Sequence, residues 1–232
     1  MKRDILDALN EARRARRPAV LVRPLPEGDQ SLLIDGDLIA GPALDETLRQ
    51  AARTCLRLDK GVVVESGGAQ VFVQPFNPPL QLFIVGAVHI AQSLVPMARL
   101  AGYAVTVIDP RRAFASDERF PDVSISTAWP DEALEPDTLT SRSALVTLTH
   151  DPKIDDPALE VGLRSDAFYI AALGSKKTHA GRIERLREAG FDPPAIGRIH
   201  GPAGLKIGAV SPAEIALSVM AQMTAVLRQG EA

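Results

Sequence analysis

The sequence has little of what marks several large classes of protein. Only one of its 232 residues is cysteine, and 4% are aromatic. One cysteine cannot form an internal disulfide, so we expect a cytoplasmic protein rather than a disulfide-rich secreted one. Cys55 lies within a helical pattern, which favours a small buried side chain over a reactive thiol. Few aromatic residues, with no basic stripe between them, argue against nucleic-acid recognition.

Long apolar runs and a strong net charge are also absent. No apolar run reaches the roughly 18–20 residues that a membrane-spanning helix needs. Residues 1–18 (MKRDILDALNEARRARRP) lack the apolar core of a signal peptide. The formal net charge of −3 gives no general attraction to nucleic acid or to anionic membranes. The sequence contains no CxxC, HxxxH, HExxH or GxSxG motif, so we expect neither a metal site nor a hydrolase-type serine nucleophile.

Hydrophobic residues make up 46% of the chain, which is ample for one large domain or two small ones. We expect residues 1–78 to form a small α+β domain, because short apolar strands alternate there with turn signals. Asp35-Gly36 and Gly67-Gly68 are typical two-residue hairpin turns. The segment 75–79 (PFNPP) predicts a stiff linker and the domain boundary. The elements expected before it are helices over 3–16 and 44–58 and strands over 20–23, 32–34, 38–39, 62–65 and 70–74.

Residues 80–232 predict a second domain, a Rossmann-like α/β fold. The apolar run 80–85, a helical pattern over 87–100 and a second apolar run over 103–108 form a strand–helix–strand unit. Its crossover should be right-handed, so the two strands lie parallel and adjacent. The later alternation predicts an open parallel sheet with helices on both faces. The further elements expected are strands over 123–126, 144–149 and 168–173, a helix over 156–163, a basic helix that follows residues 174–177 and runs to 188, a glycine-rich loop over 199–208 and a last helix from 211.

The turn after the first strand of this fold is similar to a nucleotide-binding turn. The dinucleotide fingerprint is G-x-G-x-x-G/A, and residues 86–91 read Gly-Ala-Val-His-Ile-Ala. The first glycine and the final small residue match, but Val88 replaces the glycine that lets the backbone approach a pyrophosphate. The fold signal is therefore strong, whereas tight NAD binding is disfavoured. A Rossmann-type turn that binds no dinucleotide is an equal alternative.

Polar residues gather after the expected strands, where ligands bind in open parallel sheets. Asp109 ends the second strand and could accept hydrogen bonds from a ribose, while Arg111 beside it could hold a phosphate. The alternative is an aspartate that caps a turn and an arginine in solvent. His150 and Asp151 follow a later strand and offer a possible base next to a carboxylate. Asp151 could equally begin the next turn.

A second candidate phosphate site is the segment Gly174-Ser175-Lys176-Lys177. It places backbone N–H groups and two cations at the start of a helix. The alternative is a solvated basic helix end. His200 lies in the glycine-rich loop, where a histidine is more typical of structural hydrogen bonding than of catalysis. We expect Glu214 to be the capping-box partner of Ser211 rather than a catalytic acid.

Five stretches together resemble the XdhC/CoxI family, the accessory proteins of molybdenum hydroxylases. They read FIVGAVHIA, VIDPRRAFASDERFP, VTLTHDPKIDDPAL, YIAALGSKKTHAGRIERL and RIHGPAGLKIGAVSPAEIALSVMAQM, and they cover nearly all of residues 80–228. The resemblance implies a Rossmann-like C-terminal domain in a cytoplasmic maturation factor. Such proteins bind molybdenum cofactor, assist the acquisition of its terminal sulfur and deliver it to an enzyme of the xanthine dehydrogenase or CO dehydrogenase type.

The same resemblance implies partners and a cargo for the residues that follow the strands. The partners would be the large subunit of the molybdoenzyme and a cysteine desulfurase, and the protein would be a homodimeric chaperone rather than a turnover enzyme. Its cargo would be molybdopterin or the nucleotide form of molybdenum cofactor. The residues that we expect to contact this cargo are Gly86, His89, Asp109, Arg111, His150, Asp151, Gly174, Ser175, Lys176, Lys177 and His200.

Two features depart from the family's pattern. The turn usually reads GAGH, and here residues 86–89 read GAVH. The N-terminal domain usually carries a cysteine in a glycine-rich word of the SGGC-E kind, whereas the corresponding residues 39–46 (IAGPALDE) hold none. A role of that thiol in sulfur handling therefore cannot be transferred to this chain.

A crevice with cationic helix starts can hold a pterin that carries a phosphate. We hypothesise that the phosphate docks at residues 174–177, an arrangement that would tolerate Val88 in the other turn. Two other functions stay open. One is an NAD(P)-dependent oxidoreductase with His150 as proton donor, and the other is an interaction scaffold without a ligand.

Overall fold

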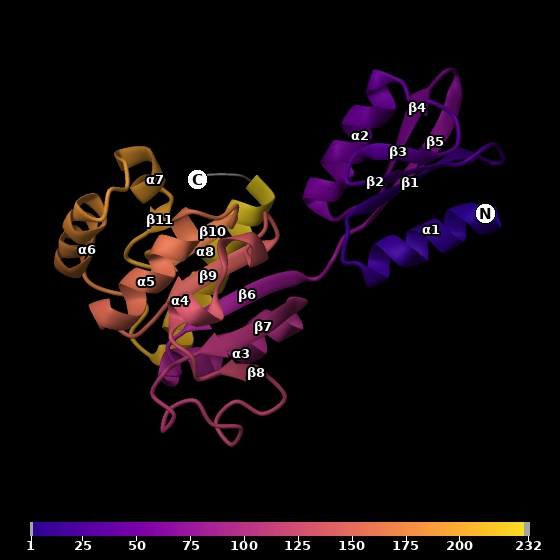
Figure 1. The fold of residues 1–232 in the computed structure, drawn as a ribbon. Coiled ribbons are helices and arrows are strands. Elements are labelled where there is room, and N and C mark those ends of the chain that lie inside the picture. The colour runs from indigo at the N-terminus through magenta and orange to yellow at the C-terminus, as the bar shows by residue number, and fades with distance from the viewer. Residues whose placement is uncertain (1, 230–232) are drawn as a thin grey trace. The chain divides into compact units, whose positions relative to one another are not determined.

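The computed structural model describes residues 2–229. It divides the chain into two compact units, residues 1–78 and 79–232. Each unit has its own β-sheet (Figure 1). Among the described residues, no helix combines the length and the apolar character that a membrane crossing requires.

The N-terminal unit is a five-stranded antiparallel sheet with one helix on each face. The strand order is β3-β2-β1-β5-β4. The expected hairpin turns are confirmed, because both residues of Asp35-Gly36 and of Gly67-Gly68 have positive φ. The elements are α1 (Arg3–Arg14), β1 (Ala19–Leu25), β2 (Ser31–Ile34), β3 (Asp37–Ala40), α2 (Glu46–Leu58), β4 (Val62–Ser66) and β5 (Ala69–Phe76).

Two separate apolar cores form on the two faces of this sheet. Helix α1 buries Ile5 and Leu9 on one face, and α2 buries Leu48 and Cys55 on the other. Cys55 is fully buried, and its Sγ donates to the carbonyl of Ala52 at 3.2 Å. Burial raises the pKa of the Cys55 thiol to about 11. The expectation of a small buried side chain at this position is confirmed.

The C-terminal unit is a sheet of six parallel strands in the order β11-β10-β9-β6-β7-β8. If β6 is numbered as the first strand, the order read from β8 to β11 is 3-2-1-4-5-6, which is the strand order of the Rossmann fold. The order reverses between β6 and β9, which makes that junction the switch point where ligand crevices form. The strands are β6 (Leu80–Val85), β7 (Tyr103–Ile108), β8 (Ser124–Ser126), β9 (Ser143–Thr147), β10 (Tyr169–Ala172) and β11 (Ile199–His200). The helices are α3 (His89–Leu100), α4 (Pro130–Ala133), the 3₁₀ turn η1 (Pro136–Thr138), α5 (Pro152–Leu163), α6 (Lys176–Glu188), α7 (Pro193–Gly197) and α8 (Pro212–Gln229).

Helices cover both faces of the parallel sheet. Val146 and Ala171 belong to the core that α3 and α8 complete, and Leu145 and Ile170 belong to the core that α5, α6 and α7 complete. A strand buried on both faces reads as a mainly apolar run, and β9, whose five residues are all buried, shows this at residues 144–146. The expected α/β class, a parallel sheet between two helical layers, is confirmed.

Some local expectations were wrong, and one was right. Helix α5 begins at Pro152 rather than at Asp156-Pro157, because Asp151 and Pro152 already supply an N-cap and a first-turn proline. The segment expected as a loop over 199–208 begins with β11, which pairs with β10. The capping box at α8 is confirmed, since Ser211 N–H donates to Glu214 Oε2 at 2.8 Å and Glu214 N–H donates to Ser211 Oγ at 3.2 Å.

Candidate functional site

The turn after β6 packs the backbone of Gly86 against the residues that follow β9. Gly86 has φ of +114°, a conformation that favours glycine. A Cβ atom on Gly86 would lie 2.7 Å from Cγ2 of Thr149. The Gly86 N–H also donates to the carbonyl of Ile108 at 2.8 Å, which fastens the turn to β7. Close packing of three strand ends at the switch point therefore requires the first glycine of the fingerprint.

Asp109 follows β7 and lies fully buried beside this turn. Its Oδ2 accepts from Ala87 N–H at 2.8 Å and from Arg111 Nη2 at 2.8 Å. Its Oδ1 accepts from the backbone N–H of Arg111 at 3.0 Å and from Arg111 Nε at 2.9 Å. These four bonds use the acceptor capacity of the carboxylate. The carboxylate thus holds two loops of the protein together, which agrees with the alternative of an aspartate that caps a turn.

Arg111 is bound to Asp109 and still keeps part of its guanidinium in solvent. The side chain is 36% exposed, and its Cζ lies 4.7 Å from the ring centroid of Phe114. The hydrogen bond to Asp109 raises the pKa of Arg111, and the charges of Asp151 and Asp155 act in the same direction. Burial works to raise the pKa of Asp109, but the hydrogen bonds from Arg111 and Ala87 and the charge of Arg111 together outweigh it, so that pKa lies below its ordinary value. The exposed part of Arg111 can meet an anion.

The N-terminus of α3 lies at the switch point without a side-chain cap. Val88 occupies the N-cap position, and its side chain has no hydrogen-bonding atom. By contrast, Asp151 caps α5 and Ser175 caps α6 with side-chain oxygens. The first N–H groups of α3 and the positive end of its dipole are therefore open to an anion. His89, the first residue of α3, is exposed next to them.

His150 and Asp151 form the loop between β9 and α5. His150 has a left-handed backbone, with φ of +64°, and its side chain is exposed. Asp151 Oδ1 accepts from the backbone N–H of Lys153 at 3.0 Å. Of the two alternatives for Asp151, the start of the next helix is the one that the structure shows.

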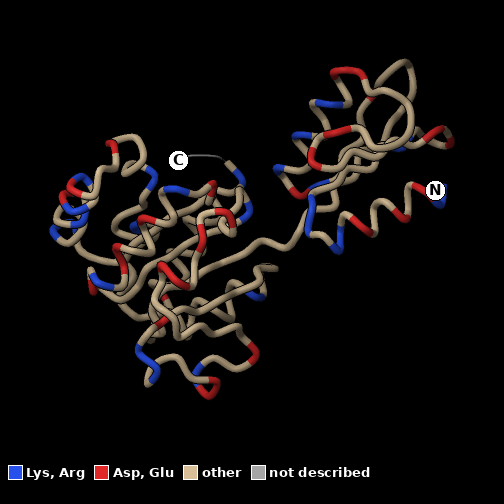
Figure 2. The backbone as a smooth tube through the Cα atoms, viewed as in Figure 1, with Lys and Arg blue, Asp and Glu red and all other residues tan. Residues whose placement is uncertain are grey.

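A cavity of about 250 Å³ lies between the first turns of α5 and α6. His150 borders it from the β9–α5 loop, and Lys177 borders it from α6, so two of the expected site segments meet here. The charged residues that line it are Asp155, Asp156, Lys177, Arg182 and Arg185. Three cationic side chains face two carboxylates, so the lining favours an anion. Figure 2 shows the blue run of Lys and Arg along α6.

The remaining expected residues have other surroundings. Ser175 uses its Oγ to cap α6, accepting from Thr178 N–H at 3.1 Å. Lys176 is exposed and lies outside the lining of the cavity. Gly174 has φ of +147° and precedes the cap. His200 lies on the edge strand β11, where its ring stacks on Tyr169 with 4.9 Å between the centroids.

The predicted site residues therefore fall into three groups. The switch-point turns hold Gly86, His89, Asp109 and Arg111. The cavity joins His150 to Lys177, with Asp151, Gly174, Ser175 and Lys176 in the loops and helix start that flank it. His200 stands apart at the edge of the sheet.

Sequence reasoning missed a buried ion pair in the wall of this cavity. Asp155 and Arg182 are 1% and 2% exposed, and Arg182 Nη2 lies 3.6 Å from Asp155 Oδ2. A signal was present in the sequence. Asp155 lies three and four residues before the buried Ala158 and Leu159, so it falls on the buried side of α5. Arg182 lies four residues before the buried Leu186, so it falls on the buried side of α6. A charge on the apolar stripe of each of two neighbouring helices indicates a buried pair.

The two partners of this pair differ in how well their polar atoms are satisfied. Asp155 accepts from Thr149 Oγ1 at 2.7 Å and from His150 N–H at 3.1 Å. Arg182 Nη2 donates to the carbonyl of Leu173 at 3.2 Å, but its Nε and Nη1 are buried without a partner among the described residues. Burial raises the pKa of Asp155 above its ordinary value, although the bonds from Thr149 and the charge of Arg182 oppose it. Burial lowers the pKa of Arg182, which remains protonated at neutral pH.

The neighbouring pair at the mouth of the cavity is satisfied. Arg185 donates to both oxygens of Asp156, with Nε at 2.5 Å and Nη2 at 3.1 Å. The charges of Arg185 and Asp156 cancel locally. The cation in the lining that no carboxylate engages is Lys177, which is exposed and has no ion pair among residues 2–229.

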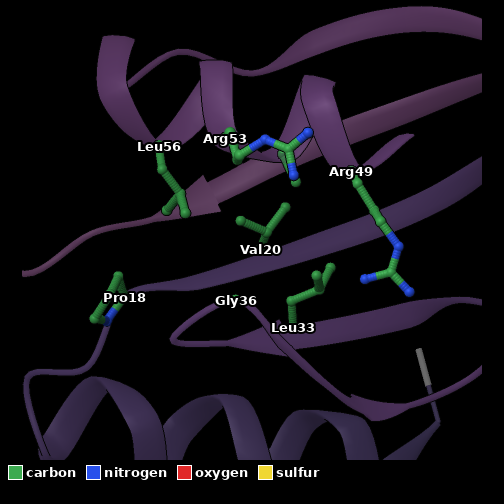
Figure 3. Close-up of a pocket in the computed structure, with 8 residues that line it drawn as sticks. Pro18, Val20, Leu33, Gly36, Arg49, Arg53 and Leu56 are labelled. Carbon is green, nitrogen blue, oxygen red and sulfur yellow. The ribbon is translucent and has the colours of Figure 1, made fainter. Parts of the chain in front are cut away.

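A smaller cavity lies in the N-terminal unit, and its chemistry is different. Its volume is about 140 Å³, and apolar side chains of the sheet and of α2 form its floor, among them Val20, Leu33 and Leu56 (Figure 3). Arg49 and Arg53 border it. Arg49 donates to the carbonyl of Leu44, and Arg53 pairs with Glu46. This cavity suits an apolar group, and its cations are already engaged.

The histidine and acidic side chains of the site do not form a metal centre. Across residues 2–229 no group of three or more His, Cys, Asp or Glu side chains is placed to hold a metal ion.

Comparison with known proteins identifies the family. The XdhC Rossmann domain matches residues 82–223, which is more than half of the chain and nearly the whole of the C-terminal unit. The chain belongs to the XdhC family. The resemblance expected from the five sequence stretches is confirmed.

Two of the curated relatives of this XdhC-family chain show the extent of the similarity. A probable xanthine dehydrogenase subunit of Bacillus subtilis is 34% identical over 157 residues, which are 66% of this chain and 44% of the relative. The molybdenum cofactor insertion chaperone PaoD of Escherichia coli is 29% identical over 151 residues, which are 65% of this chain and 41% of the relative. The chain spans less than half the length of these relatives.

A solved structure extends the fold comparison to both units of this XdhC-family chain. The crystal structure of a xanthine dehydrogenase from Bacillus halodurans matches with a TM-score of 0.71 at 24% identity. The match covers 99% of this chain and 65% of that protein. At this identity the likeness shows the fold alone.

Proposed function

We propose that this chain binds molybdenum cofactor at the carboxyl edge of its parallel sheet and delivers it to a molybdoenzyme. The observation that carries the proposal is the family membership of residues 82–223, with a relative named as a molybdenum cofactor insertion chaperone. The matched residues include the switch-point turns and the cavity between α5 and α6. The cargo is a pterin that carries a phosphate.

The chemistry of this edge supports an anionic cargo. The first turn of α3 has no side-chain cap, and Arg111 exposes part of its guanidinium. Lys177 adds an exposed cation beside His150. Open helix N-termini and cations without partners are the groups that bind phosphate and other oxyanions.

The same features give less support to an NAD(P)-dependent oxidoreductase. Val88 places a branched side chain where a pyrophosphate needs glycine, and the carboxylate of Asp109 has no oxygen left for a ribose. A thermal shift titration with NAD and NADP at millimolar concentration separates the two functions. The chaperone proposal predicts no shift, whereas a clear shift favours the oxidoreductase.

Finer parts of the proposal concern the partners. The client is the large subunit of an enzyme of the xanthine dehydrogenase or CO dehydrogenase type, the terminal sulfur comes from a cysteine desulfurase, and the protein acts as a homodimer. Residues 1–78 act as the XdhC/CoxI-type N-terminal domain. Cys55 is fully buried with a raised pKa, and residues 39–46 hold no cysteine. We therefore propose that Cys55 carries no sulfur between the desulfurase and the bound cofactor.

Co-purification tests the proposal. The full chain is isolated from a host that makes molybdopterin and, as control, from a host that cannot. Released pterin is quantified by fluorescence after oxidation and identified by mass spectrometry, and the loaded chain is then mixed with a client apoenzyme. We expect pterin on the first sample only and recovery of client activity. A chain that emerges without pterin, or loaded with a nicotinamide dinucleotide, would contradict the proposal.

A further inference from the structure

Arg182 differs from the buried aspartates of this site, Asp109 and Asp155, because its polar atoms are not all satisfied. It is 2% exposed, and two of its nitrogen atoms, Nε and Nη1, are buried without a hydrogen-bond partner among residues 2–229. A buried polar group without a partner is costly, and it usually has a functional reason when it persists. The carboxylate of Asp155 does not satisfy the guanidinium, because its approach to Nη2 is 3.6 Å and no other Arg182 nitrogen reaches it within hydrogen-bond distance.

Arg182 belongs to the wall of the 250 Å³ cavity between α5 and α6. Both helices begin at this cavity, since Pro152 and Lys177 of their first turns also line it. The positive ends of two helix dipoles therefore converge on the same space. Helix α5 has 12 residues and α6 has 13, so each is long enough to have a substantial dipole.

The charge balance of the lining points to one anion. Arg185 neutralises Asp156 through two hydrogen bonds, and Arg182 faces Asp155. Lys177 has no carboxylate partner among residues 2–229, so the side chains that line the cavity carry a net charge of +1. An oxyanion could reach Lys177 directly from the solvent side and could accept from Arg182 on the inner side after a small shift of that side chain.

We propose that the cavity between the first turns of α5 and α6 is a phosphate-binding subsite, with Arg182 and Lys177 as its donors. The identification of the bound phosphate as that of the pterin cargo rests on the proposed function. The affinity of the subsite for inorganic phosphate does not rest on the proposed function. The subsite places the phosphate beside His150 and on the side chain of Lys177, rather than on Ser175, whose hydroxyl is used as the cap of α6.

The first arm of the test uses inorganic phosphate and the full chain in phosphate-free buffer. Isothermal titration compares the wild type with Lys177→Ala and Arg182→Gln. The control is Lys153→Ala, which removes an equal charge from an exposed lysine in the first turn of α5 that lies outside the cavity lining. We expect each cavity variant to weaken phosphate binding about tenfold or more, as expected for loss of a charge-assisted hydrogen bond, and the control to stay within about twofold.

Absence of phosphate binding to the wild type, or equal binding by all variants, would overturn the subsite. Arg182→Gln alters a buried pair, so its folding is checked by thermal denaturation. If it does not fold, the comparison of Lys177→Ala with Lys153→Ala decides the outcome, because both side chains are exposed.

The second arm separates free phosphate from the phosphate of the cargo. Molybdenum cofactor is titrated into the wild type in the presence and absence of inorganic phosphate. Competition, with a parallel loss in Lys177→Ala, supports the assignment to the cargo. Cofactor binding that ignores phosphate and Lys177 overturns that assignment while leaving the chaperone proposal intact. Phosphate binding without any cofactor binding supports the anion subsite and contradicts the chaperone proposal.

Discussion

Two aspartate–arginine pairs with a buried aspartate stand at the carboxyl edge of the same sheet, and they are built differently. Asp109 and Arg111 lie two residues apart and share three hydrogen bonds, while Ala87 N–H supplies a fourth to the carboxylate. Asp155 and Arg182 come from different helices, and their closest approach is 3.6 Å. The first pair is satisfied within the protein, whereas the second leaves two guanidinium nitrogens unpartnered within the described part of the chain.

The difference separates structure from binding at this edge. The carboxylate of Asp109 has no acceptor capacity left for a ligand, so Asp109 acts as a clamp between the β6 turn and the β7 loop. An unsaturated pair holds hydrogen-bonding capacity that an anion can use. The residue in the position of the dinucleotide fold's ribose acceptor is thus structural, and the unsaturated guanidinium of Arg182 lies on the other side of the switch point.

The largest expected effect contrasts the two carboxylates. Asp109→Asn should lower the free energy of unfolding by about 3 kcal/mol, because the amide presents a donor to groups that are already donors. Asp155→Asn should cost less, about 1 kcal/mol, because burial already penalises the charged form of Asp155. Urea denaturation at neutral pH measures both. Equal losses, or a larger loss at Asp155, would remove the distinction between the pairs.

Phosphate should stabilise the folded chain through the second pair only. At a phosphate concentration ten times the dissociation constant, the wild type should gain about 1.4 kcal/mol. Lys177→Ala should lose most of this gain, whereas Lys176→Ala should keep most of it, because only Lys177 lines the cavity. Thermal denaturation with and without phosphate gives the comparison. A larger loss in Lys176→Ala would shift the anion to the outer side of α6.

The pH dependence of stability should have opposite signs at the two aspartates. The folded-state pKa of Asp109 is lowered, so its stabilisation is present above the unfolded pKa of about 3.9 and is lost as the pH falls through the folded value. The folded-state pKa of Asp155 is raised, so its charge is destabilising above that pKa, and the cost fades as the pH falls towards about 3.9.

The variants Asp109→Asn and Asp155→Asn test these signs by denaturation at a series of pH values. The first should lose stability less steeply than the wild type below pH of about 4. The second should lack the relative gain on acidification above that pH. Parallel curves for all three proteins would contradict the assignment.

The smallest expected effect concerns the uncapped helix at the switch point. Val88→Thr retains a branched side chain and adds a hydroxyl at the N-cap, so it should stabilise the protein by about 0.5–1 kcal/mol. The same hydroxyl would occupy N–H groups of α3, and cofactor affinity should fall by a few-fold if those groups hold the cargo. A stabilised variant with unchanged affinity would assign the cargo to the α5–α6 cavity alone.

Much of the fold could be predicted because local signals agreed with the final packing. Apolar runs such as 80–85 and 144–149, turn glycines and the capping box at Ser211 each specify one local structure, and the strand order then follows from short right-handed crossovers. The start of α5 was misplaced because two Asp-Pro signals of equal quality exist, at 151–152 and 156–157. The two-residue strand β11 carries too short a pattern to be distinguished from a loop.

The site was harder to predict, because hydrogen-bond saturation is a property of tertiary structure. Asp109 has the sequence position of a ribose acceptor, and only the fold shows that Ala87 and Arg111 use its oxygens. Arg182 lies in a run of basic residues that looks solvated, and its burial depends on α5. His200 could be located on the chain, but its stacking on Tyr169 comes from the pairing of β11 with β10.

In the proposed function, the C-terminal unit holds a phosphorylated pterin. Equilibrium dialysis of purified molybdenum cofactor against the full wild-type chain, at low ionic strength and with inorganic phosphate as competitor, tests it most directly. We expect the chain to retain the cofactor saturably, at about one cofactor per chain, and we expect inorganic phosphate to reduce this retention. Cofactor that passes freely through the wild-type sample, under conditions in which NAD is retained, would contradict the claim.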